Sequence, residues 1–122
     1  MQSNKATRRL GLGYFGASTG AAAALVAAAE RVDIVRAVVS RGGRPDLAAP
    51  VLGRVKAPTL LIVGGNDFPV IDMNCQALAK LQVEKELVII SGATHLFEEP
   101  GALEQVAKLA SDWFVKHLTA EA

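Results

Sequence analysis

The segment that most constrains the fold is a Gly-x-Ser-x-Gly run, residues 16–20, set between an apolar stretch and an alanine-rich one. The pattern predicts a strand over residues 10–15 and a helix over 19–30. The sharp turn between them would hold the hydroxyl of Ser18 in the open. Such a turn needs both glycines, because a Cβ at either position would meet the neighbouring strand and helix. The segment therefore indicates a nucleophilic serine, although Ser18 as a simple helix N-cap is the alternative interpretation.

An acidic residue and a histidine follow the serine along the chain, each placed after a predicted strand. Residues 58–63 are apolar and lead into Asp67, and residues 86–90 lead into His95. Short runs rich in branched apolar side chains are typical of strands buried on both faces of a parallel sheet. The carboxyl ends of such strands share one edge, where α/β proteins build their sites. We therefore expect the three polar side chains to converge there.

Simpler roles remain open for these polar residues. Asp67 would otherwise form an Asn-Asp turn, and His95 would be a loop histidine bonded to the backbone. Asp72 is the nearest competitor for the acid, but it falls within the next predicted helix. His117, the other histidine of the chain, is expected to be a solvated cation near the end of the last helix.

Two charged segments flank the predicted site. Residues 41–46, Arg-Gly-Gly-Arg-Pro-Asp, follow the second strand and would either contact a substrate carboxylate or form an exposed loop tip. Glu98 and Glu99 are expected to be a charge pair that complements the dipole at the start of the last helix. Neither segment is assigned to the site.

Strands alternate with helices along the whole sequence, which predicts right-handed crossovers and a parallel sheet. A short helical turn is expected over residues 47–52, within the loop 40–57. Residues 1–122 are predicted to form a single domain. The remaining predicted elements are strands at 35–39, 58–63 and 86–90, and helices at 70–81 and 101–118.

Composition argues against several classes of partner. The chain carries 13 basic and 12 acidic residues, so nucleic acid and anionic membranes are unlikely ligands. No metal or cofactor motif is evident, and no cofactor is expected. The single cysteine, Cys75, excludes an intramolecular disulfide, is expected to be buried in its helix and favours a reducing, cytoplasmic location. Residues 7–29 also resemble a twin-arginine export signal, but cleavage there would remove Ser18.

Together these motifs resemble the α/β-hydrolase superfamily, most closely its dienelactone-hydrolase-like esterase branch. The resemblance spans residues 13–118 and is carried by residues 13–20, 58–67 and 92–97, which read GYFGASTG, PTLLIVGGND and GATHLF. It implies Ser18 as nucleophile where dienelactone hydrolases proper use cysteine, which points towards esterase chemistry.

The resemblance covers only the second half of the family fold, since the family normally has further strands before the nucleophile strand. The fold class is thus a minimal, half α/β-hydrolase fold: a mostly parallel four-stranded sheet flanked by helices. An uncovered edge of the nucleophile strand would pair with another strand. We therefore expect a homodimer that extends the sheet to eight strands.

The implied function is a carboxylesterase that cleaves small soluble esters through an acyl-enzyme. The resemblance gives Ser18, Asp67 and His95 as the triad, and the backbone N–H of Thr19 as one donor of the oxyanion hole. A second donor normally comes from an early loop of the fold that the sequence lacks. The alternative is therefore a weak or inactive hydrolase-fold fragment that serves as an interaction or structural module.

Overall fold

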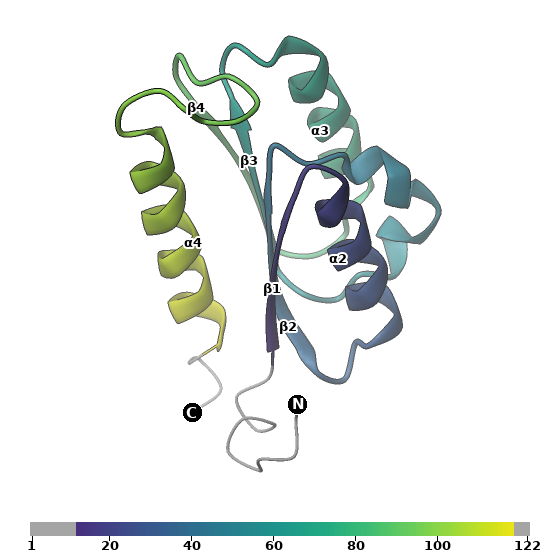
Figure 1. The fold of residues 1–122 in the computed structure, drawn as a ribbon. Coiled ribbons are helices and arrows are strands. Elements are labelled where there is room, and N and C mark those ends of the chain that lie inside the picture. Colours follow the sequence, from purple (N-terminus) through teal and green to yellow (C-terminus); the bar gives the residue numbers. More distant parts are fainter. Residues whose placement is uncertain (1–11, 119–122) are drawn as a thin grey trace.

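The computed structural model describes residues 12–118, which form an α/β fold around one parallel sheet (Figure 1). The strands lie in the order β1-β2-β3-β4, and every neighbouring pair is parallel. This confirms the predicted fold class of a four-stranded parallel sheet flanked by helices. The elements are β1 (Leu12–Ala17), α2 (Thr19–Glu30), β2 (Val35–Arg41), η1 (Pro45–Arg54), β3 (Thr59–Gly64), α3 (Phe68–Lys80), β4 (Lys85–Ile90) and α4 (Ala102–Leu118).

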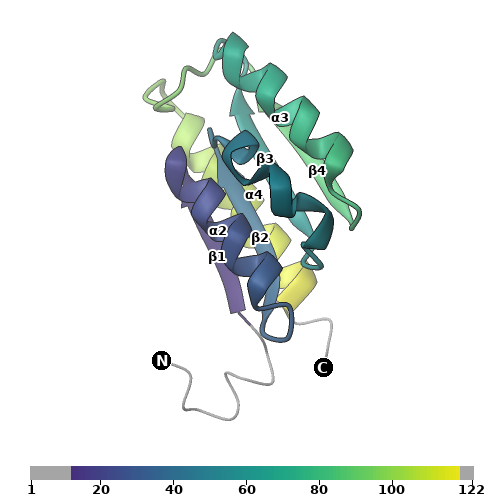
Figure 2. The same ribbon diagram turned by 90° about the vertical axis from the view of Figure 1, so that its right-hand side faces the viewer.

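Helices cover both faces of the sheet. Figure 2 shows α2, η1 and α3 on the near face, with α4 behind the strands. All six residues of β3 are buried, as expected for a central strand covered on both sides. At the edge of the sheet, β4 keeps only Ile90 buried, because the strand has a neighbour on one side only.

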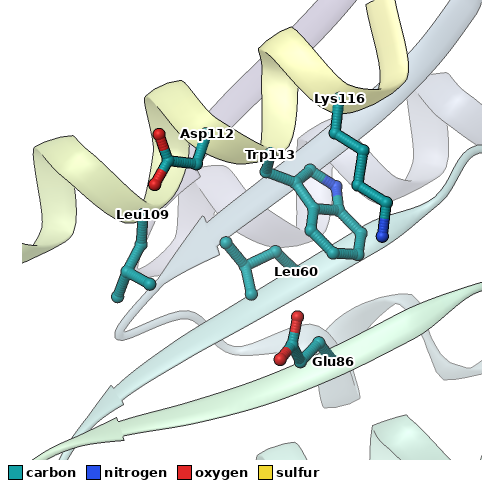
Figure 3. Close-up of a pocket in the computed structure, with 6 residues that line it drawn as sticks. All are labelled: Leu60, Glu86, Leu109, Asp112, Trp113 and Lys116. Atoms are coloured by element: carbon teal, nitrogen blue, oxygen red, sulfur yellow. The ribbon is translucent and has the colours of Figure 1, made fainter. Parts of the chain in front are cut away.

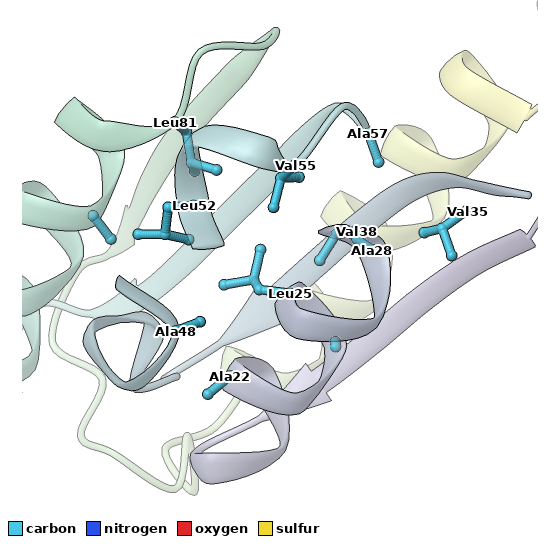
Figure 4. Packing of buried hydrophobic residues seen from close by; sticks show 12 residues of the cluster. Ala22, Leu25, Ala28, Val35, Val38, Ala48, Leu52, Val55, Ala57 and Leu81 are labelled. Atoms are coloured by element: carbon cyan, nitrogen blue, oxygen red, sulfur yellow. The ribbon is translucent and has the colours of Figure 1, made fainter. Parts of the chain in front are cut away.

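Each face of the sheet has its own apolar core. The first core packs α2 against the sheet and η1, and alanines such as Ala28 let the helix approach closely (Figure 4). In the second core, α4 places Trp113 and Val106 over the opposite face, together with the fully buried Phe97. The first core contains the buried residues Ala22, Ala24, Leu25, Ala28, Val35, Val38, Ala48, Leu52, Val55, Ala57, Ala77 and Leu81.

Several element boundaries differ from the sequence prediction. The first strand runs to Ala17, directly before Ser18, and residues 10 and 11 of the predicted strand lie outside the described residues. The second strand continues to Arg41, and the expected short turn at 47–52 is a longer 3-10 helix, η1. Neither the expected dimer nor the single-domain organisation is tested by the structure.

Two predicted side-chain environments were wrong. Cys75 is exposed, because the buried face of α3 consists of Val70, Asn74 and Ala77, and Cys75 lies off it. His117 is not a solvated cation, since its side chain is 9% exposed and its ring lies 4.3 Å from that of Trp113. Burial lowers the pKa of His117, against the opposing effect of a nearby glutamate.

Within residues 12–118, no helix has the length and apolar character that crossing a membrane requires.

Candidate active site

Ser18, His95 and Asp67 form a continuous row of hydrogen bonds at the carboxyl edge of the sheet. The hydroxyl oxygen of Ser18 lies 2.8 Å from Nε2 of His95, and Nδ1 of His95 lies 2.8 Å from Oδ2 of Asp67. A proton on Nδ1 is donated to the carboxylate, which leaves Nε2 free to accept the serine proton. This is the order of groups that activates a serine hydroxyl as a nucleophile.

The three side chains of this row differ in their exposure to solvent. The His95 side chain is 39% exposed and that of Asp67 13%, while Ser18 is half-buried. A substrate can therefore reach the serine and the imidazole from solvent. The shielded carboxylate, in contrast, is placed to hold the imidazole in one orientation.

Ser18 sits on a strained turn between β1 and α2. Its φ of 53° and ψ of −125° lie in a sparsely populated region for a residue with a side chain. Such a conformation costs of order 1–3 kcal/mol and persists only where the surroundings enforce it. The Ser18 carbonyl accepts hydrogen bonds from the N–H groups of Ala21 and Arg44, both at 3.1 Å. Its hydroxyl makes no cap bond to α2, so the simple N-cap interpretation does not describe this side chain.

The two glycines of the motif are not equivalent, which corrects the sequence expectation. A Cβ at Gly16 would lie 2.5 Å from the carbonyl oxygen of Gly20 and 2.7 Å from Cα of Ala21. A Cβ at Gly20 would have no atom within 4 Å. Only Gly16 is therefore required for the close approach of β1 to the start of α2. Gly20 lies on the exposed side of the helix.

Asp67 occupies the turn between β3 and α3, in contact with the loop that carries His95. Its backbone N–H donates to the carbonyl of Gly64, and its carboxylate makes no cap bond to α3. The neighbouring Asn66 donates its backbone N–H to the carbonyl of Ala93 at 2.9 Å. The acid loop and the histidine loop are thus bonded to each other. The competing acid, Asp72, is exposed and accepts a hydrogen bond from a glutamine of the same helix.

Glu99 fastens the histidine loop, a role that sequence reasoning missed. One carboxylate oxygen of Glu99 accepts the backbone N–H of Thr94 at 3.1 Å, and the other accepts its hydroxyl at 2.7 Å. These bonds, chiefly the one from the hydroxyl, lower the pKa of Glu99. Glu99 therefore closes the loop around His95, and its predicted role with Glu98 at the start of the last helix stays a prediction. Glu98 is exposed.

The glycine pair after β2 links the nucleophile turn with the histidine loop. Gly42 has a φ of +54°, and a Cβ there would lie 3.3 Å from the carbonyl oxygen of His95. At Gly43, a Cβ would lie 2.3 Å from the hydroxyl of Ser40. The buried side chain of Asn74 donates to the carbonyl of Gly43 at 3.2 Å. The two adjacent glycines were the feature of the sequence that could have indicated this close packing, but the atoms that they contact depend on the tertiary fold.

A pocket elsewhere on the molecule does not include Ser18, Asp67 or His95. A pocket of about 160 Å³ lies between α4 and strands β3 and β4 (Figure 3). Trp113 and Leu60 form its apolar wall, and Glu86, Asp112 and Lys116 add charges. Ser18, Asp67 and His95 are not among its lining residues, so we do not include it in the site.

Comparison with known proteins identifies the family. Residues 1–119 match the model of the dienelactone hydrolase family. The chain belongs to this family. The predicted resemblance to the dienelactone-hydrolase-like branch is thereby confirmed, and both the family and the fold are those of hydrolases.

A similar solved structure, a dienelactone hydrolase from Anabaena variabilis, is 67% identical with a TM-score of 0.91. The match covers 95% of this chain and 54% of that one, so the chain spans about half the length of that relative. A monoacylglycerol lipase from Paleococcus ferrophilus shares the fold at 19% identity, with a TM-score of 0.77 over 88% of this chain and 69% of the lipase.

A protein from Mycobacterium tuberculosis, named "Putative phosphoribosyl transferase", is 65% identical over 112 residues. Those residues make up 92% of this chain but only 25% of the relative. The transferase name therefore describes a protein of which this chain matches a quarter.

Proposed function

We propose that the chain is a serine hydrolase that cleaves small soluble carboxylic esters through an acyl-enzyme. The observation that supports it is the pair of 2.8 Å contacts that joins Ser18, His95 and Asp67 in order. Membership of a hydrolase family is consistent with this chemistry. The dienelactone hydrolases proper would use a cysteine at the position of Ser18, and the serine favours an esterase.

In the proposed reaction, Nε2 of His95 takes the Ser18 proton as the hydroxyl oxygen attacks the ester carbonyl. Asp67 stabilises the imidazolium that forms. We assign the backbone N–H of Thr19 as a donor to the oxyanion, because Thr19 follows the nucleophile at the start of α2. His95 then protonates the leaving alcohol, and water attacks the acyl-enzyme in a second cycle with the same base.

The open setting of the site favours small substrates. The side chain of His95 is 39% exposed, so a substrate can reach it directly from solvent. Small soluble esters are therefore the proposed substrates, and the reaction requires no cofactor or metal.

A second candidate function is a non-catalytic interaction module. An oxyanion hole uses two backbone donors, and we assign only one among the described residues. Thr19 supplies one backbone donor, and loss of one such donor costs roughly 10²–10³ in rate. We do not assign phosphoribosyl transfer to this segment, because it matches only a quarter of the relative that bears that name.

The test compares wild type with Ser18→Ala on a short-chain chromogenic ester. We expect hydrolysis by wild type and background rates in the variant. The matched control is Ser111→Ala, which removes an exposed serine hydroxyl from α4 and should leave the rate unchanged. A phosphonate should form a covalent adduct that mass spectrometry locates at Ser18. Equal rates in wild type and Ser18→Ala, with no adduct, would leave the interaction module as the better function.

A further inference from the structure

An asparagine of α3 is buried next to the segment that holds the nucleophile turn. Asn74 is fully buried and lies with Val70 and Ala77 on the inner face of the helix. Figure 2 shows that α3 covers the same face of the sheet as α2, the helix that follows Ser18. A buried amide needs hydrogen-bond partners, because an unpaired polar group away from water is costly.

Two backbone carbonyls hold the amide group of Asn74 in one orientation. Its Nδ2 donates to the carbonyl of Val70, one turn earlier in the same helix, at 2.8 Å, and to the carbonyl of Gly43 at 3.2 Å. Carbonyl oxygens only accept, so the nitrogen must face both of them. The amide oxygen, Oδ1, is buried and has no hydrogen-bond partner among the described residues. Stability alone does not account for this asparagine, because a partly paired buried amide stabilises no more than an apolar side chain of the same shape.

The bond to Gly43 reaches the nucleophile through one rigid peptide group. The Gly43 carbonyl and the N–H of Arg44 belong to the same planar amide unit. That N–H donates to the carbonyl of Ser18 at 3.1 Å. Ser18 has the strained φ of 53°, and such a conformation persists only where its surroundings enforce it. A rotation of the Gly43–Arg44 peptide group would therefore weaken both bonds and let the strained turn relax.

Other parts of the fold restrain the same segment. The Gly42 N–H donates to the carbonyl of Ile62 at 2.7 Å, which ties the segment to β3. A Cβ at Gly43 would clash with the hydroxyl of Ser40 and the methyl group of Ala21, so the backbone is packed tightly against β2 and α2. The sheet, α2 and α3 thus each restrain the segment, and the asparagine amide supplies a hydrogen bond from α3.

We propose that Asn74 is a positioning residue for Ser18. Its amide fixes the Gly43–Arg44 peptide group, and that group holds the nucleophile turn in its reactive conformation. The helix α3 follows Asp67 directly, and Asn74 lies seven residues later, about two turns along the same face. One helix thereby carries the acid at its start and restrains the nucleophile from its interior. The role rests on the proposed esterase function, in which Ser18 is the nucleophile.

The test measures the rate constant for phosphonate labelling of Ser18 in wild type, Asn74→Leu and Thr59→Val. Thr59→Val is the matched control, because Thr59 is also fully buried and its hydroxyl donates to a backbone carbonyl, that of Ala57, at 2.9 Å. Thr59 begins β3 and so lies away from the carboxyl edge of the sheet. Each substitution replaces polar atoms by carbon atoms in the same branched shape. All three proteins are compared at a temperature at which circular dichroism shows them folded.

We expect labelling of Asn74→Leu to be slower by roughly 10-fold or more, since a displacement of about 1 Å at a reacting atom costs roughly 10² in rate. Thr59→Val should keep the wild-type rate. Where turnover is measured, kcat should fall in Asn74→Leu with KM unchanged, because Asn74 does not touch the substrate. Equal labelling rates in the two variants would overturn the proposal.

A second variant, Asn74→Ser, serves if Asn74→Leu fails to fold. A serine hydroxyl within a helix can donate to the carbonyl four residues earlier, here that of Val70, but it is too short to reach Gly43. Asn74→Ser therefore keeps the bond within α3 and loses the one to the nucleophile segment. It should show the same slow labelling, and a wild-type rate would overturn the proposal.

Amide hydrogen exchange separates this role from the esterase function. The Arg44 N–H should exchange faster in Asn74→Leu than in Thr59→Val, whether or not the protein hydrolyses an ester. If wild type takes no phosphonate at Ser18, the esterase function fails, and faster exchange at Arg44 still supports the restraint of the turn. Unchanged exchange at Arg44 would overturn the proposal even if labelling became slower.

Discussion

The two glycines of the serine turn should respond to alanine in opposite directions. In Gly16→Ala the new Cβ would lie 2.5 Å from the Gly20 carbonyl oxygen and 2.7 Å from both the Gly20 carbonyl carbon and Cα of Ala21. All three are backbone atoms, so no side-chain rotation relieves the contact. Either the end of β1 or the start of α2 must move. In Gly20→Ala the Cβ meets nothing within 4 Å.

Ordinary contact between carbon atoms begins near 3.5 Å, so relief at Gly16 requires a shift of about 1 Å. Overpacking of this kind costs about 1–3 kcal/mol. For a chain of 122 residues, 1 kcal/mol corresponds to about 4 °C in Tm, which predicts a decrease of about 4–12 °C. A displacement of 1 Å at the nucleophile also costs roughly 10² in rate. Gly20→Ala should instead gain about 0.5–1 kcal/mol, because glycine is disfavoured within a helix.

Two measurements check this pair of variants: the Tm by circular dichroism, and the rate of phosphonate labelling of Ser18. Labelling is stoichiometric, so it reports the geometry of the nucleophile even where turnover is slow. Gly16→Ala should lower both quantities, and Gly20→Ala should raise the Tm and keep the labelling rate. Comparable losses in both variants would refute the argument, because they would mean that the motif needs both glycines.

The remaining predictions concern the acid and the histidine loop. Asp67→Asn should lower ester turnover by about 10⁴ with little change in Tm, because His95 loses the acceptor that fixes its tautomer; unchanged turnover would remove Asp67 from the triad. Glu99→Gln should lower the Tm at pH 7, since Thr94 loses a charged acceptor. The pKa of Glu99 is lowered from 4.5, so its stabilisation is present above that pH and disappears as the pH falls through the lowered value. The Tm difference from wild type should therefore shrink below about pH 4.5, and a constant difference would argue against the charged bond.

The sequence predicted those parts of the fold that depend on local patterns. The alternation of strands and helices follows from apolar runs such as residues 58–63, which the structure buries completely within β3. The placement of Ser18, Asp67 and His95 after three strands could also be inferred, because the carboxyl ends of parallel strands share an edge. Their catalytic roles stay a prediction.

What the sequence could not provide depends on contacts between distant segments. Cys75 and Asn74 are adjacent on one helix, and only the orientation of α3 decides that the amide is buried and the thiol exposed. His117 looked like a surface residue because its contact with Trp113 requires α4 to turn that face inward. Glu99 bonds to Thr94 through a loop whose shape no periodicity describes.

The loops at the carboxyl edge of the sheet are bonded to one another, which positions Ser18, Asp67 and His95. The Ser18 N–H donates to the carbonyl of Arg41, and the Gly42 N–H donates to that of Ile62, so the first three strand ends are bonded in sequence. The bond from Asn66 to Ala93 joins the fourth. Ser18, Asp67 and His95 are therefore held in place by the bonded ends of β1 to β4 and the loops that follow them. Labelling of Ser18 reports activation of the serine, whereas turnover of an ester also requires stabilisation of the oxyanion, so the two must be measured separately.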